Sequence, residues 1–177
     1  MSLLKVARMG HPVLRTRARL VERAELKQPS MQKLIDDMID TMHEYHGVGL
    51  AAPQVHEGLR IFVAAINPFE EEPLPVDVPP IVFINPVTTP IGHEMLEEWE
   101  GCLSIPDIRG KVPRVRAVKV SAMDRSGEKI DLSSQDFPAR VIQHETDHLD
   151  GVLFFDRMRS FASLTFLDEY SRYWAKD

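Results

Sequence analysis

The stretch Gln143–His148 reads QHETDH and contains the pattern His-Glu-x-x-His. In an α-helix, residues four positions apart lie one above the other, so His144 and His148 would share one face. Two imidazoles in this arrangement can bind one metal ion, and Glu145 between them can reach a water molecule at that ion. The pattern therefore predicts a metal-binding helix around which the rest of the chain must fold. The alternative for this motif alone is an amphipathic helix whose histidines are only packed or solvated.

The length and composition predict one globular domain. The chain has 177 residues, of which 44% are hydrophobic and 27% are charged, as in ordinary soluble proteins. We expect residues 1–177 to form a single catalytic domain. The net charge of -6 argues against nucleic acid or an anionic membrane as a direct partner. Because the apolar runs are too short for a bilayer and residues 1–8 lack a signal-peptide core, we expect a cytoplasmic protein.

Three segments carry the helical spacing of apolar residues. They are residues 31–45, 137–149 and 163–174. For the first helix we expect Ser30 as the N-cap and Gly47 as a left-handed stop. For the second, which carries the metal motif, Asp136 and Gly151 are the expected cap and stop. His43 and His46, near the end of the first helix, are interpreted as surface residues.

Other segments have the composition of strands, loops and turns. The predicted strands are residues 60–66, 80–85, 91–99, 116–123 and 128–132. Residues 1–29 are expected to be irregular, and the acidic, proline-rich segment 67–79 is expected to be an exposed loop. Strands with a few segregated helices favour an α+β fold. We expect antiparallel sheets packed around the central helix of the metal motif, with one helix in the N-terminal half and another at the C-terminus.

A catalytic metal usually has three protein ligands and one open position for water, so the two histidines need a third partner. The candidates upstream are His93, Glu97, Glu100 and Cys102. Cys102 is the only cysteine, which excludes an intramolecular disulfide and fits a reducing compartment. It is favoured because a thiolate binds first-row transition metals strongly.

Three stretches together resemble one known family. GVGLAAPQ (residues 47–54), EGCLS (100–104) and QHETDHLDG (143–151), in this order, closely resemble the peptide deformylases. The resemblance implies a metal-dependent hydrolase that removes the formyl group from the N-terminal formylmethionine of newly synthesised proteins and releases formate. It also implies that Cys102, His144 and His148 are the metal ligands. Fe(II) is the expected metal, and zinc, nickel or cobalt can take its place in the family.

The resemblance further implies a role for each residue of the three motifs. Glu145 would be the general acid and base, while Gln54 and the backbone N–H of Leu103 would hold the developing oxyanion. Glu100 and Arg114 match a supporting salt bridge, and Arg109 matches a position near the substrate entrance. The implied partners are N-formylmethionyl nascent peptides, and the C-terminal helix is thought to touch the ribosome in some relatives.

The methionine side chain of such a substrate needs an apolar pocket beside a backbone that it can approach. For this role we expect residues of the small-residue loop and of the metal-motif helix. They are Val48, Gly49, Leu50, Phe137 and Val141. Arg140 is unexpected here, because this position is apolar in some members of the family and a charge there alters how the pocket is closed.

Two other classes of protein compete with this interpretation. A metallopeptidase with the same helix motif would take a further His or Glu downstream of the helix, but no His follows His148 and Glu169 is the only later Glu. A non-catalytic protein with a structural metal would need a closed fourth position, for which one cysteine offers no second thiol.

Overall fold

The computed structural model describes residues 2–68 and 79–175. The acidic segment that was expected to form an exposed loop lies almost wholly outside the described residues. In the part that is described, no helix has both the length and the apolar character needed to cross a membrane.

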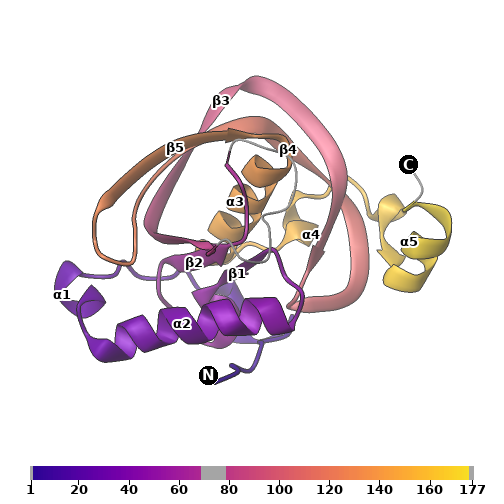
Figure 1. Ribbon diagram of the computed structural model, residues 1–177. Coiled ribbons are helices and arrows are strands. Elements are labelled where there is room, and N and C mark those ends of the chain that lie inside the picture. Colours follow the sequence, from indigo (N-terminus) through magenta and orange to yellow (C-terminus); the bar gives the residue numbers. More distant parts are fainter. Residues whose placement is uncertain (1, 69–78, 176–177) are drawn as a thin grey trace.

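Six strands form one antiparallel sheet in the order β1-β2-β3-β4-β5, with β6 paired to β4. Their bounds are Gly49–Ala51 (β1), Ile61–Ala64 (β2), Ile81–Cys102 (β3), Ile105–Met123 (β4), Lys129–Gln135 (β5) and Thr165–Phe166 (β6). The long strands β3 and β4 curve around the helix that carries the metal motif (Figure 1). The predicted α+β fold with antiparallel pairing is therefore confirmed.

The helices lie on different sides of this sheet (Figure 1). Their bounds are Arg23–Leu26 (α1), Pro29–Glu44 (α2), Asp136–Leu149 (α3), Phe154–Arg157 (α4) and Leu167–Tyr173 (α5). Short 3-10 turns cover Pro12–Arg15, Ala52–Val55 and Phe161–Ser163. The N-terminal lead-in therefore contains two short helical segments that its sequence did not reveal.

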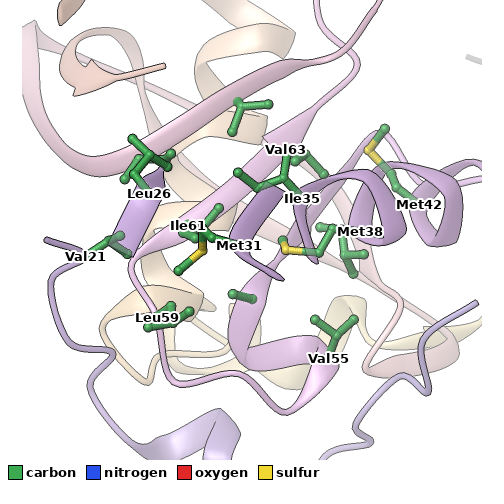
Figure 2. Packing of buried hydrophobic residues seen from close by; sticks show 14 residues of the cluster. Val21, Leu26, Met31, Ile35, Met38, Met42, Val55, Leu59, Ile61 and Val63 are labelled. Carbon is green, nitrogen blue, oxygen red and sulfur yellow. The ribbon is translucent and has the colours of Figure 1, made fainter. Parts of the chain in front are cut away.

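Strand β2 holds the two long helices together because its side chains alternate between the two faces of the sheet. Ile61 and Val63 pack with the apolar stripe of α2, in which Met31, Ile35, Met38 and Met42 are buried (Figure 2). Phe62 and Ala64 face the other way and belong to a second cluster. That cluster includes Ala139, Val141, Ile142 and Leu149 of α3. The core thus fixes α3, and with it the metal motif, against the inner face of the sheet.

The predicted ends of the long helices need corrections. Helix α2 begins at Pro29 with Gln28 in the N-cap position, so Ser30 is not the cap. Proline is favoured at the first helical position because its missing N–H would be unpaired there. At the other end His46, with φ 53°, takes the left-handed conformation that was expected of Gly47.

Helix α3 starts one residue earlier than expected. Gln135, in an extended conformation, occupies the N-cap position, and Asp136 is the first helical residue rather than the cap. The carboxylate of Asp136 instead accepts a hydrogen bond from Arg116 Nε at 2.8 Å. The predicted stop is correct, since Gly151 follows the helix with φ 74°.

Strands β3 and β4 are longer than their sequence pattern indicated, whereas β2 is shorter than the predicted segment 60–66. Residues 80–85 and 91–99 were expected to be separate strands but belong to the single strand β3, and β4 begins before the predicted 116–123 segment. Register shifts near residues 84–87, 91–95 and 100–102 absorb the irregularities of β3. The predicted C-terminal helix 163–174 is shortened to α5, because Thr165 pairs with Arg109 as part of β6.

Candidate metal centre and active site

Helix α3 presents His144 and His148 on one face, with ring centroids 4.9 Å apart. Both side chains are buried, and His148 is only 1% exposed. Burial lowers the pKa of His148 well below its ordinary value, so that its imidazole is neutral. A neutral imidazole is the form that binds a metal.

Cys102 reaches the same place from the end of β3. Its Sγ lies 3.3 Å from His148 Nε2, and the potential ligand atoms of Cys102, His144 and His148 all lie within 4.8 Å of one another. A register shift between Glu100 and Cys102 bends the strand at this point, as bulges do near active sites. The third group of the cluster is therefore the upstream thiol, whereas Glu169 lies in α5 and contacts Arg172.

The donor set fits one divalent transition metal, because a soft thiolate and two imidazoles suit iron, zinc, nickel or cobalt. Glu100 Oε2 lies 2.9 Å from His144 Nδ1, which leaves Nε2 as the nitrogen free for a metal. Burial lowers the pKa of His144, but hydrogen bonds with Cys102 and Glu100 outweigh it and raise that pKa well above its ordinary value. The surroundings of His144 thus favour positive charge, which a divalent cation would supply.

Glu145 lies next to this cluster with an unpaired carboxylate. Its side chain is buried, and Oε2 has no hydrogen-bond partner among the described residues. Burial raises its pKa to about 7. A carboxyl group with such a pKa can both accept and return a proton near neutral pH.

Gln54 and Leu103 come to the same cavity from two loops. Gln54 Oε1 accepts a hydrogen bond from Ala51 N at 2.8 Å, which directs Nε2 toward Cys102 Sγ at 3.5 Å and Ser104 Oγ at 3.3 Å. Leu103 lines the same cavity one residue after the thiol. An amide donor and the chain of the cysteine loop therefore lie beside the candidate metal site.

These residues open into one cavity of about 800 Å³. Among the residues predicted for substrate binding, five line it. They are Val48, Gly49, Arg109, Phe137 and Val141. Leu50 requires a correction: it is fully buried in the cluster beneath α2, because alternation along β1 turns it away from the face of Gly49.

Two glycines of the motifs allow close approaches. A Cβ atom on Gly49 would lie 2.4 Å from Glu145 Oε1, and one on Gly101 would lie 2.1 Å from Arg109 Nη1. The small residues of GVGLAAPQ and EGCLS therefore make room for functional side chains of other elements.

Several lining residues were missed by sequence reasoning. They include Lys5, Val6, Tyr45, Trp99 and Leu167, and His46, interpreted only as a surface residue, is exposed and also lines the cavity. The N-terminal segment reaches the cavity because Ala7 N bonds to Gln54 O at 2.7 Å and Met9 N to Ser104 O at 2.8 Å. No local pattern in the sequence predicts contacts between segments that are so far apart along the chain.

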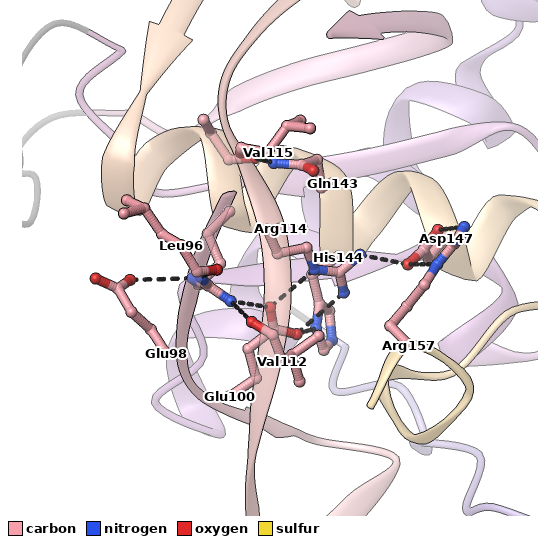
Figure 3. Close-up of polar contacts among 12 residues, drawn as sticks. Leu96, Glu98, Glu100, Val112, Arg114, Val115, Gln143, His144, Asp147 and Arg157 are labelled. Carbon is pink, nitrogen blue, oxygen red and sulfur yellow. Dashed lines mark hydrogen bonds and ion pairs between the residues drawn. The ribbon is translucent and has the colours of Figure 1, made fainter. Parts of the chain in front are cut away.

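Behind the cluster lies a network of buried ionic groups (Figure 3). Arg114 donates two hydrogen bonds to Glu100, at 2.9 and 3.0 Å, as the predicted pair requires, and a third to Asp147. Burial alone would raise the pKa of Glu100, but hydrogen bonds with His144 and Arg114 lower it far below its ordinary value. Glu100 is therefore an anion held against a candidate metal ligand.

An antiparallel α+β fold in which a thiol and two helix imidazoles converge beside a buried carboxylate is the arrangement of a metal-dependent hydrolase. Comparison with known proteins identifies the family of metal-dependent hydrolases to which this chain belongs. The family model described as polypeptide deformylase matches residues 3–163. The chain belongs to the polypeptide deformylase family.

Individual relatives agree with this assignment. Peptide deformylase 2 of Nostoc sp. is 42% identical over 175 residues, which cover 99% of this chain and 97% of the relative. Peptide deformylase 1 of Nitrosomonas europaea is 40% identical over 163 residues, 92% of each chain. Among solved structures, a class I type b peptide deformylase of Acinetobacter baumannii has a TM-score of 0.81 and 39% identity, covering 89% of this chain and 100% of that one.

Proposed function

We propose that the cavity beside α3 is where this chain removes the formyl group from N-formylmethionyl peptides, with Cys102, His144 and His148 holding one divalent metal ion. The chain is an enzyme of the deformylase family, and deformylation of nascent peptides is the activity of that family. The observation that carries the proposal is the convergence of these three ligand atoms within 4.8 Å. Related enzymes have been solved with actinonin or with Met-Ala-Ser bound.

Hydrolysis of a formamide needs a strong nucleophile at neutral pH. When bound, a divalent metal ion lowers the pKa of water to about 7 and polarises a carbonyl. Glu145 accepts a proton from the attacking water on its unpaired Oε2 and delivers it to the amine of the departing methionine. The products are formate and a peptide with a free N-terminal amine.

The negative charge that grows on the formyl oxygen needs hydrogen-bond donors. Gln54 Nε2 makes one long contact, with Ser104 Oγ at 3.3 Å, and one hydrogen bond to the weak acceptor Cys102 Sγ at 3.5 Å, so its hydrogens remain available to a better acceptor. The backbone N–H of Leu103 is the second donor that we propose. One such donor contributes about 3 kcal/mol to stabilisation of the transition state.

The peptide itself fits beside β1. This strand lies at one end of the sheet, where its second edge has no strand partner among the described residues. A peptide backbone can pair with such an edge as an added strand. Val48, Phe137 and Val141 then offer apolar contacts to the methionine side chain, and Arg109 lies at the entrance.

The native metal that we propose is Fe(II), which the thiolate and imidazole donors suit, with zinc, nickel or cobalt as substitutes. Iron and thiolate are both oxidisable, so activity should fade in air and persist under anaerobic handling. Air-stable activity in a protein that contains only iron would contradict this assignment.

We also propose that residues 1–177 form one catalytic domain in the cytoplasm, where formylated chains emerge from the ribosome. The continuous β1–β5 sheet with α2 and α3 on its two faces supports a single unit. If α5 contacts the ribosome, then Arg172→Glu, which reverses the charge of a side chain that is 61% exposed, should weaken cosedimentation with ribosomes. Unchanged cosedimentation would argue against that contact.

The proposed roles are tested by replacing the carboxylate of Glu145. Glu145→Ala should keep its metal but lose formate release from formyl-Met-Ala-Ser by about a hundredfold to ten-thousandfold, the usual contribution of a general acid and base. Thr146→Ser, on the same helix but outside the cavity lining, is the matched control. Wild-type turnover by Glu145→Ala would refute the role, and release of amino acids from an unblocked peptide would indicate a peptidase instead.

A further inference from the structure

Arg140 is a buried arginine on α3 that none of the three motif roles explains. It lies one helical turn before His144 and is 5% exposed. Its guanidinium donates to two carboxylates and two backbone carbonyls at 2.7–3.2 Å. These acceptors are Glu98 Oε2, Glu100 Oε1, Leu96 O and Val112 O. At least four of the five N–H groups of the guanidinium are thus occupied within the protein, which leaves little for a substrate.

The contact with Glu100 connects Arg140 to the candidate metal centre. Arg140 Nη1 donates to Glu100 Oε1 at 2.7 Å, and the other oxygen, Oε2, lies 2.9 Å from His144 Nδ1. Arg114 donates to both oxygens from a second direction. The plane of the Glu100 carboxylate is therefore fixed by two guanidinium groups, and its orientation decides where the imidazole of His144 points.

Arg140 also completes the charge balance of the buried network. Six side chains form a chain in which acids and bases alternate; the four inner side chains are buried, and the two at the ends are about half exposed. In order they are Glu98, Arg140, Glu100, Arg114, Asp147 and Arg157. Three carboxylates thus face three guanidinium groups. Without Arg140, Arg114 would be the only arginine paired with Glu100, in surroundings where an unbalanced charge is costly.

We propose that Arg140 is a positioning residue that acts through Glu100 to aim His144 at the metal. This inference rests on the proposed function, because it assumes that His144 is a ligand. Partners of metal-bound histidines orient the ring and strengthen the ligand, and their loss typically weakens metal binding about tenfold to a hundredfold. Arg140 also lines the cavity, but because at least four of its N–H groups are bonded within the protein, we assign it to the metal centre rather than to substrate binding.

Cobalt provides the probe, since its visible absorption reports ligand geometry. The dissociation constant of Co²⁺, measured by competition with a chelator, and the spectrum are compared for Arg140→Met, Arg140→Lys and wild type. We expect Arg140→Met to bind Co²⁺ about tenfold to a hundredfold more weakly with an altered spectrum. Arg140→Lys should recover part of the loss, because an ammonium group can pair with Glu100 but cannot bridge both carbonyls.

Arg60 is the matched control. It is also buried, and it donates to Leu149 O and Asp150 Oδ1 at the end of the same helix, with no contact to Glu100. Arg60→Met and Arg60→Lys should lower the unfolding temperature but leave Co²⁺ affinity within about twofold of wild type. If Arg140→Met does not fold, the Co²⁺ affinities and spectra of Arg140→Lys and Arg60→Lys are compared instead, and only Arg140→Lys should differ from wild type.

Two results would overturn the inference. One is wild-type affinity and spectrum in both Arg140 variants, and the other is an equal loss of affinity in the Arg60 variants, which would show a general effect of destabilisation. The proposed function is tested separately by Cys102→Ala. If Co²⁺ binds that variant with unchanged affinity and spectrum, the metal centre itself is wrongly assigned, whatever the Arg140 variants do.

Discussion

Glu145, the proton carrier that we propose, can take its observed position only because residue 49 has no side chain. The Cα of Gly49 faces the carboxylate so closely that a Cβ would overlap Oε1 and Cδ, at 2.4 and 2.8 Å. Gly49→Ala must therefore displace Glu145, and a displacement of about 1 Å can lower a rate about a hundredfold. We expect kcat to fall by about that factor while the metal content stays at the wild-type level.

The matched control for this substitution is Gly58→Ala. An added Cβ at Gly58 has no neighbour within 4 Å, so kcat should be unchanged. Equal kcat values for Gly49→Ala and wild type would show that the carboxylate does not need its observed position.

Residues in the motifs could be foreseen because their spacing is local. His144 and His148 share one helical face by periodicity alone, Glu145 lies between them in the same motif, and Cys102 was the only thiol available. The partners of Arg140 could not be foreseen in this way, since they come from four positions on two strands. Leu50 was misplaced because one step along a strand turns a side chain from the cavity to the core.

Among the elements, α3 depends on a sharp end at Gly151. This residue has φ 74°, and a Cβ there would lie 2.8 Å from the backbone of Arg15. Gly151→Ala should therefore lose about 3 kcal/mol of unfolding free energy, from left-handed strain plus the overlap. Urea unfolding gives the value.

Gly10→Ala separates the two causes, because Gly10 has φ 106° but no atom within 4 Å of an added Cβ. It should lose only about 1–2 kcal/mol, the cost of the backbone strain. Equal losses in the two variants would mean that contact between α3 and the N-terminal segment contributes nothing.

Elements with a strong local pattern were the ones that could be foreseen. The sequence pattern located α2 and α3 to within a few residues. It predicted two separate strands where the structure has the single strand β3. Its middle section carries Pro86, Pro90 and Gly92, which are turn signals, and most of its side chains there are exposed, so the alternation of a half-buried strand is absent. Pairing with β4, which no local signal encodes, keeps this section extended.

At the scale of the whole molecule, the candidate metal site joins the end of β3 to α3. The proposed ligands come from positions 42 residues or more apart, Cys102 and the pair on α3. A metal that binds only the folded chain stabilises it by about 4 kcal/mol at a thousandfold excess over the dissociation constant. Removal of the metal with a chelator should therefore lower Tm by about 10 °C.

Calorimetry with and without chelator checks this expectation. Cys102→Ala, which lacks the proposed ligand from β3, should show a much smaller shift. The same shift in both proteins would place the stabilising metal elsewhere.

X-ray absorption at the edge of the metal in anaerobically purified protein tests the ligand set most directly. A centre built from Cys102, His144 and His148 should show one sulfur at about 2.3 Å and two imidazole nitrogens at about 2.0–2.1 Å, with any further ligand a light atom. A first shell of only oxygen and nitrogen, without sulfur, would contradict the account.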